Sequence, residues 1–328
     1  MVGSSFYQEP EQFRTIFICG PTGSGKSALA IKIAQKVNGS VINADSMQVY
    51  QGLEILTACP SSSDKDLVPH KLYNFVDPNQ KHSVGIWLSH ALKALEEVRQ
   101  SGRVPIFVGG TGLYFRALLD GLAPIPQISN DIRLDSQNLF ETIGRKAFCA
   151  RLDELDPIGL RQVGKNDTQR LLRLYEVALA TGKTLREWHA LGSEKRLNGL
   201  GEVIKFILSP DRNELYCSIN DRVEKMVSVG LLEELQLFIA RGVCSSSPAL
   251  RAVGVSEFSD YLDGRIQLED AILSSQLRTR RYAKRQLTWF RNQMSSAQWL
   301  RGFGDSVAKI AINSMNQRNQ VDQILSKD

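Results

Sequence analysis

The feature that most constrains this chain is a phosphate-binding loop near its amino terminus. The loop satisfies every fixed position of the pattern G-x-x-x-x-G-K-[ST]. An apolar, β-rich run over residues 15–19 predicts a buried strand before the loop, and apolar residues spaced by four over residues 29–37 predict a helix after it. A strand, a glycine-rich loop and a helix in this order indicate an α/β fold. The residues of the loop are Gly20, Pro21, Thr22, Gly23, Ser24, Gly25, Lys26 and Ser27.

The composition of the loop explains what it binds. Its glycines let backbone N–H groups converge on a phosphate without obstruction by Cβ atoms, and the following helix adds partial positive charge at its amino terminus. Lys26 adds a full positive charge, and the Ser27 hydroxyl can hold Mg²⁺ that bridges phosphate oxygens. The loop by itself does not identify the molecule that carries the phosphates.

Further strands and helices alternate after the loop. Residues 40–44 predict a second buried strand, residues 84–99 an amphipathic helix, and residues 104–108 a third strand that ends in glycines. This alternation predicts a parallel sheet with helices on both faces, as in the phosphate-loop NTPases.

The middle of the chain differs in composition. Two prolines within residues 121–126 indicate an exit from the sheet, residues 131–191 show helical periodicity, and residues 203–208 predict a strand that returns to the sheet. We therefore expect an α/β core over residues 12–120 and 201–300, an inserted all-helical domain over residues 121–200, and a polar, weakly docked tail over residues 301–328.

Charge and composition exclude several classes of protein. The net charge of +5 permits a polyanionic partner without establishing one. The five cysteines are scattered without a C-x-x-C pair, and the four histidines lack the spacing of metal ligands, so neither a disulfide framework nor a zinc site is indicated. No apolar run approaches the roughly 20 residues of a membrane span. We expect a cytoplasmic protein that does not enter a membrane.

Asp45 is the first candidate for chemistry beyond the loop. It follows the second predicted strand, at the edge where open α/β sheets place functional groups. It could hold magnesium, as in phosphate-loop hydrolases, or accept a proton from a substrate; a helix N-cap is the structural alternative. The third strand ends in Gly109-Gly110-Thr111-Gly112, where a hydrolase would have a second acid. These glycines argue against nucleotide hydrolysis, and a tight turn alone would also explain them.

Two basic clusters suggest contact with a polyanion. In the first, Asp167 is expected to cap a helix that carries Arg170 and Arg173 on one side. The second, residues 278–291, holds six positive charges and no negative one. Its arginines share a helical stripe with aromatic residues, which suits stacking on nucleic-acid bases, although a solvated basic helix is the alternative. The stripe consists of Arg278, Arg281, Tyr282, Arg285 and Trp289. Arg222 could bind a diphosphate or form a salt bridge.

Taken together, these motifs resemble the tRNA dimethylallyltransferases, also called isopentenyl-diphosphate:tRNA transferases. The similarity extends from about Ile16 to Arg291. Each motif is of modest specificity, and their order makes the set specific. The motifs are the loop at 20–27, Asp45-Ser46 with Gln48 and Tyr50, Gly109 to Tyr114, Asn166-Asp167 with Gln169, Arg170, Arg173 and Glu176, and Thr279-Arg280 with Ala283 to Gln286 and Thr288-Trp289.

The resemblance implies a reaction and a set of roles. The loop would hold the diphosphate of dimethylallyl diphosphate with Mg²⁺ at Ser27, and the dimethylallyl group would pass to N6 of adenosine 37 beside the tRNA anticodon. Asp45 would be the general base, Thr111 would hydrogen-bond near the attacking nitrogen, and Lys26 and Arg222 would neutralise the diphosphate.

The family also implies how RNA is bound. The adenine would leave the anticodon-loop stack, the helical insertion would close over the anticodon arm, and the enzyme is expected to act as a monomer. The residues implied to contact the anticodon stem-loop are Asp45, Ser46, Met47, Gln48, Thr111, Arg133, Gln169, Arg170, Leu171, Leu172, Arg173, Arg281, Lys284 and Arg285.

The chain departs from the family pattern at three places. Leu56-Thr57-Ala58-Cys59-Pro60 stands where Gly-Thr-Ala-Lys-Pro is usual, Val253-Gly254-Val255 replaces Ile-Gly-Tyr, and Lys71 follows His70 where a second histidine is common. None of these departures removes a proposed catalytic group, but each bears on loop geometry and RNA contacts.

Two other functions remain compatible with parts of the sequence. A nucleotide or small-molecule kinase would explain the first 50 residues, with Asp45 binding the acceptor hydroxyl, but it leaves the basic helix at 278–291 unexplained. An RNA-binding module with a purely structural loop would bind tRNA even after Lys26→Ala and would form no product.

Overall fold

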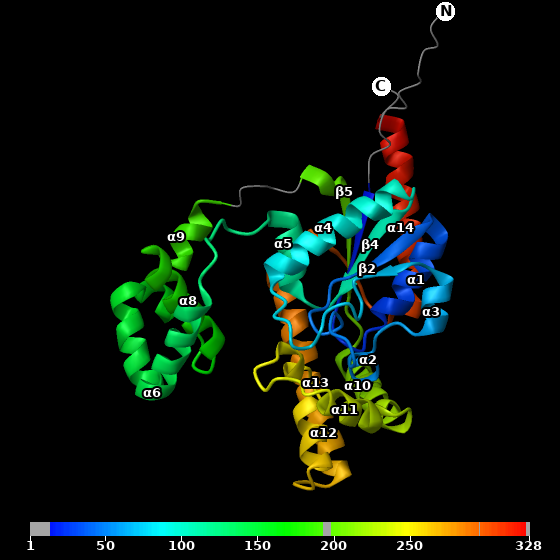
Figure 1. Cartoon of the computed structure of the whole chain (residues 1–328). Coiled ribbons are helices and arrows are strands. Elements are labelled where there is room, and N and C mark those ends of the chain that lie inside the picture. The colour runs from blue at the N-terminus through cyan, green and yellow to red at the C-terminus, as the bar shows by residue number, and fades with distance from the viewer. Residues whose placement is uncertain (1–13, 193–197, 295, 326–328) are drawn as a thin grey trace, which may run out of the picture. The chain divides into compact units, whose positions relative to one another are not determined.

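The computed structural model describes residues 14–192, 198–294 and 296–325. The chain forms two compact units, which are drawn in Figure 1. The α/β unit is made of the chain up to Leu118 and from Asn198 onward, and the helical unit spans Leu119–Leu197. The helical insertion was expected over residues 121–200, and each of these bounds lies within three residues of the corresponding end of the helical unit.

The α/β unit is built on a six-stranded sheet in the order β3-β2-β4-β1-β5-β6. Every neighbouring pair is parallel, so the predicted parallel sheet is confirmed. Strands β3 and β6 were not predicted, because they are two and three residues long and too short to show a period. The strands are β1 (Arg14–Cys19), β2 (Gly39–Asn43), β3 (His70–Lys71), β4 (Val104–Gly109), β5 (Glu202–Leu208) and β6 (Gln298–Leu300).

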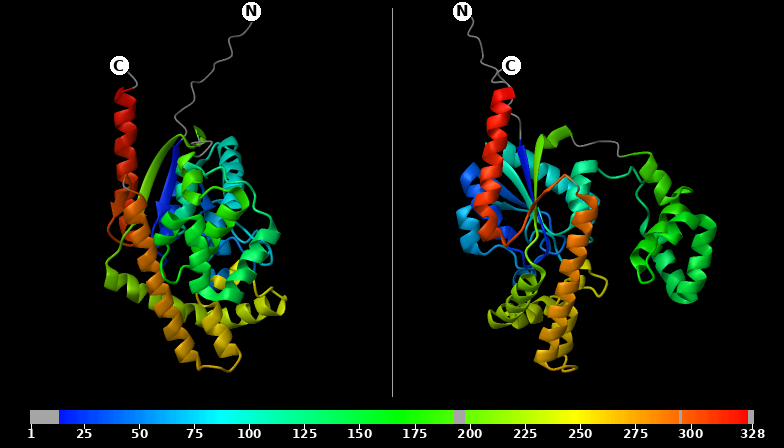
Figure 2. Two further views of the ribbon diagram at one scale, coloured as in Figure 1. Left: turned by 90° about the vertical axis from the view of Figure 1, so that its left-hand side faces the viewer. Right: turned by 180° about the vertical axis from the view of Figure 1, so that it is seen from behind.

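Alternate side chains of the central strands are buried on opposite faces of the sheet, because successive side chains of a strand point to opposite faces. Ile16 and Ile18 join a core formed with helices α1 (Lys26–Val37) and α14 (Gly304–Leu325). Phe17 points to the opposite face, where its ring packs 5.6 Å from Phe107 and 5.2 Å from Phe115. That face is covered by α4 (Val84–Gln100) and α5 (Gly112–Asp120), as Figures 1 and 2 show.

Helix α14 corrects the expectation of a weakly docked tail after residue 300. Its residues Val307, Ala308, Ala311 and Met315 are buried in the same core as residues of α1. Small and apolar residues at helical spacing form this face, and the polar residues between them masked it in the sequence. The α/β unit therefore continues beyond residue 300.

Four helices lie beyond the carboxyl edge of the sheet (Figure 1). Gly230 and Gly254 precede two of them with φ angles of 104° and 103°, a left-handed conformation that glycine adopts without strain. Gly230, Gly242, Gly254 and Gly264 all lie at helix ends. The helices are α10 (Arg212–Ser228), α11 (Leu231–Ala240), α12 (Val255–Leu262) and α13 (Leu268–Gln293).

The helical unit has its own small core. Phe148 and Leu152 of one helix pack with Leu171, Leu174 and Tyr175 of another. Side-chain caps begin each helix, as their Ser, Asp and Thr residues predict. The expected cap at Asp167 is confirmed, since its carboxylate accepts a hydrogen bond of 3.0 Å from the Arg170 N–H. The helices are α6 (Asn130–Leu155), α7 (Pro157–Arg161), α8 (Thr168–Thr181) and α9 (Leu185–Ala190).

The remaining elements are short. Helices α2 (Glu54–Thr57) and α3 (Ser62–Leu67) lie between β2 and β3. Single 3₁₀ turns, η1 (Asn198–Leu200) and η2 (Pro248–Arg251), precede β5 and α12. Within the described residues, no helix is both long and apolar enough to cross a membrane.

Candidate active site

The phosphate-binding loop joins β1 to α1, as its sequence pattern predicts. Gly23 and Gly25 have φ angles of 82° and 79°, and Gly25 is the N-cap of α1. Glycine is required there because other L-residues are strained in this conformation. The loop is also held from outside: the Ser218 hydroxyl donates to the Gly23 carbonyl at 3.1 Å, and the Gly304 N–H donates to the Ser24 carbonyl at 3.0 Å.

Two cations contact the loop: Lys26, which is part of it, and Arg222, which lies on α10. The Lys26 ammonium donates to the Pro21 carbonyl at 2.7 Å, and Arg222 Nη2 donates to the Thr22 hydroxyl at 2.5 Å. Burial lowers the pKa of Lys26 to about 8, an effect that the charge of Asp45 opposes and that of Arg222 reinforces. Burial also lowers the pKa of Arg222 below its usual value, and its Nε–H is buried without a hydrogen-bond partner. Both groups are partly buried cations that an anion would stabilise.

Asp45 lies at the carboxyl end of β2, and a hydrogen-bond network places the residues around it. Its carboxylate accepts from the Met47 N–H at 2.9 Å, and its own N–H donates to the buried Asn43 side chain at 2.8 Å. The Thr111 hydroxyl accepts from the Ser46 N–H at 2.9 Å, which ties the glycine turn after β4 to the turn after β2. The candidate residues Asp45, Ser46, Met47 and Thr111 are therefore neighbours, as parallel strand ends predict.

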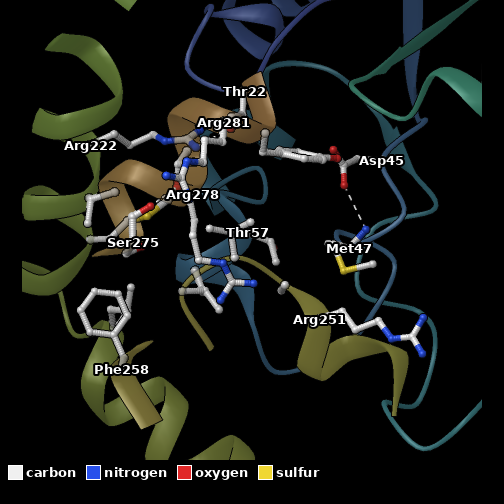
Figure 3. Close-up of a pocket in the computed structure, with 18 of the residues that line it drawn as sticks. Thr22, Asp45, Met47, Thr57, Arg222, Arg251, Phe258, Ser275, Arg278 and Arg281 are labelled. Atoms are coloured by element: carbon white, nitrogen blue, oxygen red, sulfur yellow. Dashed lines mark hydrogen bonds between the residues drawn. The ribbon is translucent and has the colours of Figure 1, made fainter. Parts of the chain in front are cut away.

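A cavity of about 550 Å³ within the α/β unit is lined by Thr22, Asp45, Ser46, Met47 and Arg222, whereas Lys26 and Thr111 are not among its lining residues. In Figure 3, Thr22 and Arg222 lie toward one end, Asp45 lies across the cavity from Arg222, and Phe258 lies at the far end from Thr22. The cavity thus has a polar end at the phosphate-binding loop and an apolar end between α10, α11 and α12. The apolar end is lined by Leu56, Val223, Met226, Leu231, Ala252, Val253 and Phe258.

Helix α13 supplies a basic wall to the same cavity. Arg278, Arg281, Tyr282 and Arg285 all line it, so most of the predicted stripe faces one space. Arg278 forms an ion pair with the buried Glu257, and Arg285 lies 5.6 Å from the Tyr282 ring. Burial raises the pKa of the Tyr282 hydroxyl, and the charge of Asp45 acts in the same direction, so this phenol stays neutral.

Trp289 does not join this wall and corrects part of the predicted stripe. Its indole packs against Gly112, where a Cβ atom would lie only 2.1 Å from the ring. The ring also meets Phe290 at 5.4 Å. This contact joins α13 to the start of α5, and the rest of the indole is partly exposed.

Comparison with known proteins decides the family. The profile described as IPP transferase matches residues 48–293, and one described as Isopentenyl transferase matches residues 13–69. The tRNA dimethylallyltransferase of Rhodospirillum centenum is 42% identical over 299 residues, covering 90% of this chain and 94% of that protein. That of Phenylobacterium zucineum is 44% identical over 282 residues, covering 86% of this chain and 91% of its own.

The chain belongs to the tRNA dimethylallyltransferase family. Solved structures agree: a tRNA isopentenylpyrophosphate transferase from Bacillus halodurans superimposes with a TM-score of 0.68 at 32% identity, covering 96% of this chain and all of the other. A eukaryotic dimethylallyltransferase acting on tRNA superimposes with a TM-score of 0.78 at 26% identity, covering 95% of this chain and 80% of that one. The family and the phosphate-loop fold predicted from sequence motifs are confirmed.

Not every RNA-contact residue implied by the family lies at the cavity. Lys284 is exposed on α13 but is not among the residues that line the cavity. Gln48 lies after Met47, and its amide nitrogen donates to the carbonyls of Thr57 and Ala58, both at 2.9 Å. Gln48 therefore stabilises the adjacent turn.

The remaining implied RNA contacts belong to the helical unit. Arg170 is exposed on α8, whereas Arg173 is half-buried and lies 3.7 Å from Glu176. Burial is the main cause that lowers the pKa of Arg173, and Arg133 lowers it further, so these two cations lie near each other. Gln169 is exposed beside Arg170.

Leu171 and Leu172, which the family pattern implies as RNA contacts, lie on the packed side of α8. The Leu171 side chain is fully buried in the core of the helical unit, and Leu172 packs against the same core. The motif contains them because α8 needs an apolar face, while the basic residues beside them face outward. Side-chain contact of Leu171 with RNA is excluded as long as this core is intact.

The departures from the family pattern lie partly on the cavity wall. Leu56 and Val253 line the apolar end, and Leu56 Cδ1 would lie 2.7 Å from a Cβ atom placed on Gly254. Cys59 stands where lysine is customary, so this position loses a cation. Burial raises the pKa of the Cys59 thiol to about 12, so the thiol stays neutral. Lys71, in strand β3, forms a salt bridge with Glu97 at 2.6 Å.

Several residues of the site were not predicted from the sequence. Phe258, Met226 and Leu231 form much of the apolar wall, and their own sequence segments show only ordinary amphipathic helices. Gln286 was noted as part of a motif, but nothing in the sequence indicated which groups it contacts. A polar residue inside the buried stripe of α13 is the one signal that could have drawn attention to it.

Proposed function

We propose that this cavity transfers the dimethylallyl group from dimethylallyl diphosphate to N6 of adenosine 37 of tRNA, the reaction of its family. The N6 nitrogen attacks C1 of the dimethylallyl group, and the bond from C1 to the diphosphate oxygen breaks. The diphosphate leaves with the bonding electrons, and the proton of N6 passes to Asp45. Atoms and charges balance without any further reactant.

The polar end of the cavity suits the leaving group. Thr22 and Arg222 line this end, and the partly buried Lys26 lies in the same loop as Thr22. The backbone amides of residues 20–27 would add further donors. A diphosphate would accept hydrogen bonds from them as charge develops on its oxygen, which is the main way such a site lowers the barrier. The apolar end would take the five-carbon chain, since its lining is almost entirely hydrocarbon.

Magnesium fits this arrangement through few protein ligands. Among the described residues, no group of three or more His, Cys, Asp or Glu side chains is placed to hold a metal ion. Mg²⁺ commonly keeps several waters and binds through substrate phosphates, so the exposed Ser27 hydroxyl and two diphosphate oxygens would suffice. When bound there, Mg²⁺ would neutralise part of the charge of the diphosphate.

Asp45 and Thr111 suit the acceptor side. The adenine amine is a weak nucleophile because its lone pair is delocalised into the ring, so a carboxylate that takes its proton during attack lowers the barrier. One Asp45 oxygen is held by the Met47 N–H, which orients the carboxylate at the cavity wall. Thr111 is held by hydrogen bonds to Ser46, and its hydroxyl would form a hydrogen bond near the attacking nitrogen.

The RNA would be bound by the basic wall and by the helical unit. Arg281 and Arg285 line the cavity, where they would meet the phosphates beside an everted adenine. Arg133, Arg170 and Arg173 would contact the anticodon stem-loop from the helical unit. We also propose that the enzyme acts as a monomer, in the cytoplasm, where its tRNA substrate is found.

The observation that carries this proposal is one cavity lined by Thr22 of the phosphate-binding loop, by Arg222 and by Asp45. The test is to incubate the protein with unmodified tRNA, Mg²⁺ and radiolabelled dimethylallyl diphosphate, and to digest the RNA to nucleosides. Label in N6-(dimethylallyl)adenosine is expected. Turnover of ATP with a small acceptor, and no label in RNA, would favour a kinase instead.

A further inference from the structure

One side chain connects the two sides of the reaction without facing either substrate. Gln286 of α13 is 5% exposed and is not among the residues that line the cavity. Its Oε1 accepts a hydrogen bond of 2.8 Å from the Thr22 N–H in the phosphate-binding loop. Its Nε2 donates a hydrogen bond of 3.0 Å to the Gly110 carbonyl in the turn after β4. A single planar amide therefore spans the distance between the two turns.

The two contacts require an amide of this length. The Thr22 N–H can only donate and the Gly110 carbonyl can only accept, so the bridging group must offer one acceptor and one donor. An ionised carboxylate has no donor, and a hydrocarbon has neither group. The turn is adapted to the same contact, because a Cβ atom on residue 110 would lie 2.0 Å from Gln286 Nε2.

The bridge continues to the acceptor side through consecutive residues. Thr111 follows Gly110, its N–H donates to the Ala44 carbonyl at 3.3 Å, and its hydroxyl accepts from the Ser46 N–H at 2.9 Å. On the other side, Thr22 accepts the hydrogen bond from Arg222. A continuous set of hydrogen bonds thus joins the loop assigned to the diphosphate with the turns that carry Thr111 and Asp45.

Helix α13 gives this bridge a fixed base. Ala283, one turn before Gln286, is fully buried against Leu215 and Ile219 of α10. Phe290, one turn after, packs on Phe115 of α5 at 6.2 Å. The amide is therefore held on a packed helix, and such support is what keeps reacting groups within a few tenths of an ångström of a productive geometry.

We propose that Gln286 is a positioning residue that sets the spacing between the diphosphate-binding loop and the acceptor turns. This inference rests on the proposed function, because it assigns the loop to the diphosphate and Asp45 with Thr111 to the adenine. A positioning residue of this kind lowers the barrier by alignment. Its loss should lower kcat much more than it weakens the binding of either substrate, since every group that faces the cavity is still present.

The first test compares two substitutions on one helix. Gln286→Leu removes both hydrogen bonds of the bridge. Gln276→Leu is the matched control, because Gln276 is 4% exposed on α13 and donates to the Asn220 carbonyl at 3.3 Å and to Glu224 at 3.2 Å, away from both turns. We expect Gln286→Leu to lower kcat by about 100-fold and to change KM for either substrate by less than about fivefold. Gln276→Leu should leave both constants within about threefold of the unsubstituted protein while costing similar thermal stability.

Inorganic pyrophosphate with Mg²⁺, titrated calorimetrically, separates alignment from support of the loop. Its affinity for Gln286→Leu should stay within about fivefold of that of the unsubstituted protein. An affinity that falls in proportion to kcat would overturn the proposal, because Gln286 would then only keep the loop folded. An equal loss of kcat in Gln276→Leu would overturn it as well.

The second test uses Gln286→Glu and pH. A protonated glutamic acid has the same acceptor and donor as glutamine, whereas the carboxylate places a negative charge against the Gly110 carbonyl. Burial raises the pKa of such a carboxyl above its usual value of about 4.3. The kcat of Gln286→Glu, divided by that of the unsubstituted protein at each pH, should therefore fall at least about fivefold between pH 6 and pH 8.5.

The outcomes distinguish the two proposals. If the unsubstituted protein transfers no label, the proposed function fails and this inference fails with it. If it transfers label normally and the Gln286→Glu ratio does not change with pH, the function stands and the positioning role is wrong. A flat ratio for Gln286→Leu, whose side chain does not titrate, is the control for the pH series.

Discussion

Lys26 allows a prediction whose size follows from its surroundings. Burial lowers the pKa of its ammonium to about 8, and the ammonium donates to the Pro21 carbonyl. A bound diphosphate would add negative charge beside this group and raise its pKa again. Below pH 8 the free protein already carries the proton, so binding takes up little. Above pH 8 the free amine is neutral, and binding must take up a proton from solution.

The magnitude follows from linkage. At a pH equal to the pKa, half of the lysines are neutral, so binding should take up about half a proton at pH 8 and only about a tenth at pH 7. Above the pKa, affinity should fall by up to about tenfold for each pH unit, because the proton must be supplied before the ion pair forms. Uptake should approach one proton near pH 9.

Isothermal titration with inorganic pyrophosphate and Mg²⁺ measures this uptake when it is repeated in two buffers of different ionisation enthalpy. Lys26→Arg is the reference, because a guanidinium keeps its proton throughout this range and the titration of pyrophosphate itself is common to both proteins. The difference in uptake between the two proteins should rise from pH 7 to pH 9. Equal uptake at every pH would refute the assignment of Lys26 as a buried cation that titrates near pH 8.

The remaining predictions concern the base, the support of the loop and the basic wall. Asp45→Asn should lower kcat by about 10²–10⁴-fold while pyrophosphate affinity, measured by calorimetry, stays within about threefold; a variant with normal kcat would eliminate Asp45 as the base. Gly304→Ala should lower the free energy of unfolding, measured by chemical denaturation, by about 1–3 kcal/mol, because a Cβ at this position would lie 2.0 Å from the Gly25 carbonyl oxygen. Gly199→Ala is the control, since a Cβ there would meet no atom within 4 Å. Equal losses in the two variants would contradict the packing argument. Arg285→Ala should make the slope of the logarithm of the tRNA association constant against the logarithm of the salt concentration shallower by about 0.7 to 0.9. Filter binding over a series of salt concentrations measures this slope. An unchanged slope would show that Arg285 does not neutralise a phosphate.

The individual motifs were predictable because each depends on local chemistry. The loop from Gly20 to Ser27 requires glycines at left-handed positions, and Asp167 caps a helix within its own turn. Asp45 was placed at the edge of the sheet because a carboxylate directly after an apolar strand has no other position in a parallel fold. Each of these inferences uses only a few neighbouring residues.

Errors arose where a residue's environment comes from distant segments. Leu171 was expected in a stretch that contacts RNA, but its side chain is buried in one core with Phe148 of another helix, and Trp289 was expected in a basic stripe but packs on Gly112. The polar residues of α14 concealed the apolar side that completes the core beside α1. In each case the residue against which the side chain packs lies at least about twenty residues away in the chain.

The sequence by itself determined the strand, loop and helix that bind phosphate, the parallel sheet, and the family, because these depend on short patterns of backbone conformation and hydrophobic period. Only the tertiary structure decided which groups share the cavity and how the two halves of the reaction are joined. Thr22, Gly110 and Gln286 are separated by up to 264 residues, yet two hydrogen bonds unite them. The reason is physical: hydrogen-bond partners in a folded chain are set by packing, and packing is a property of the whole unit.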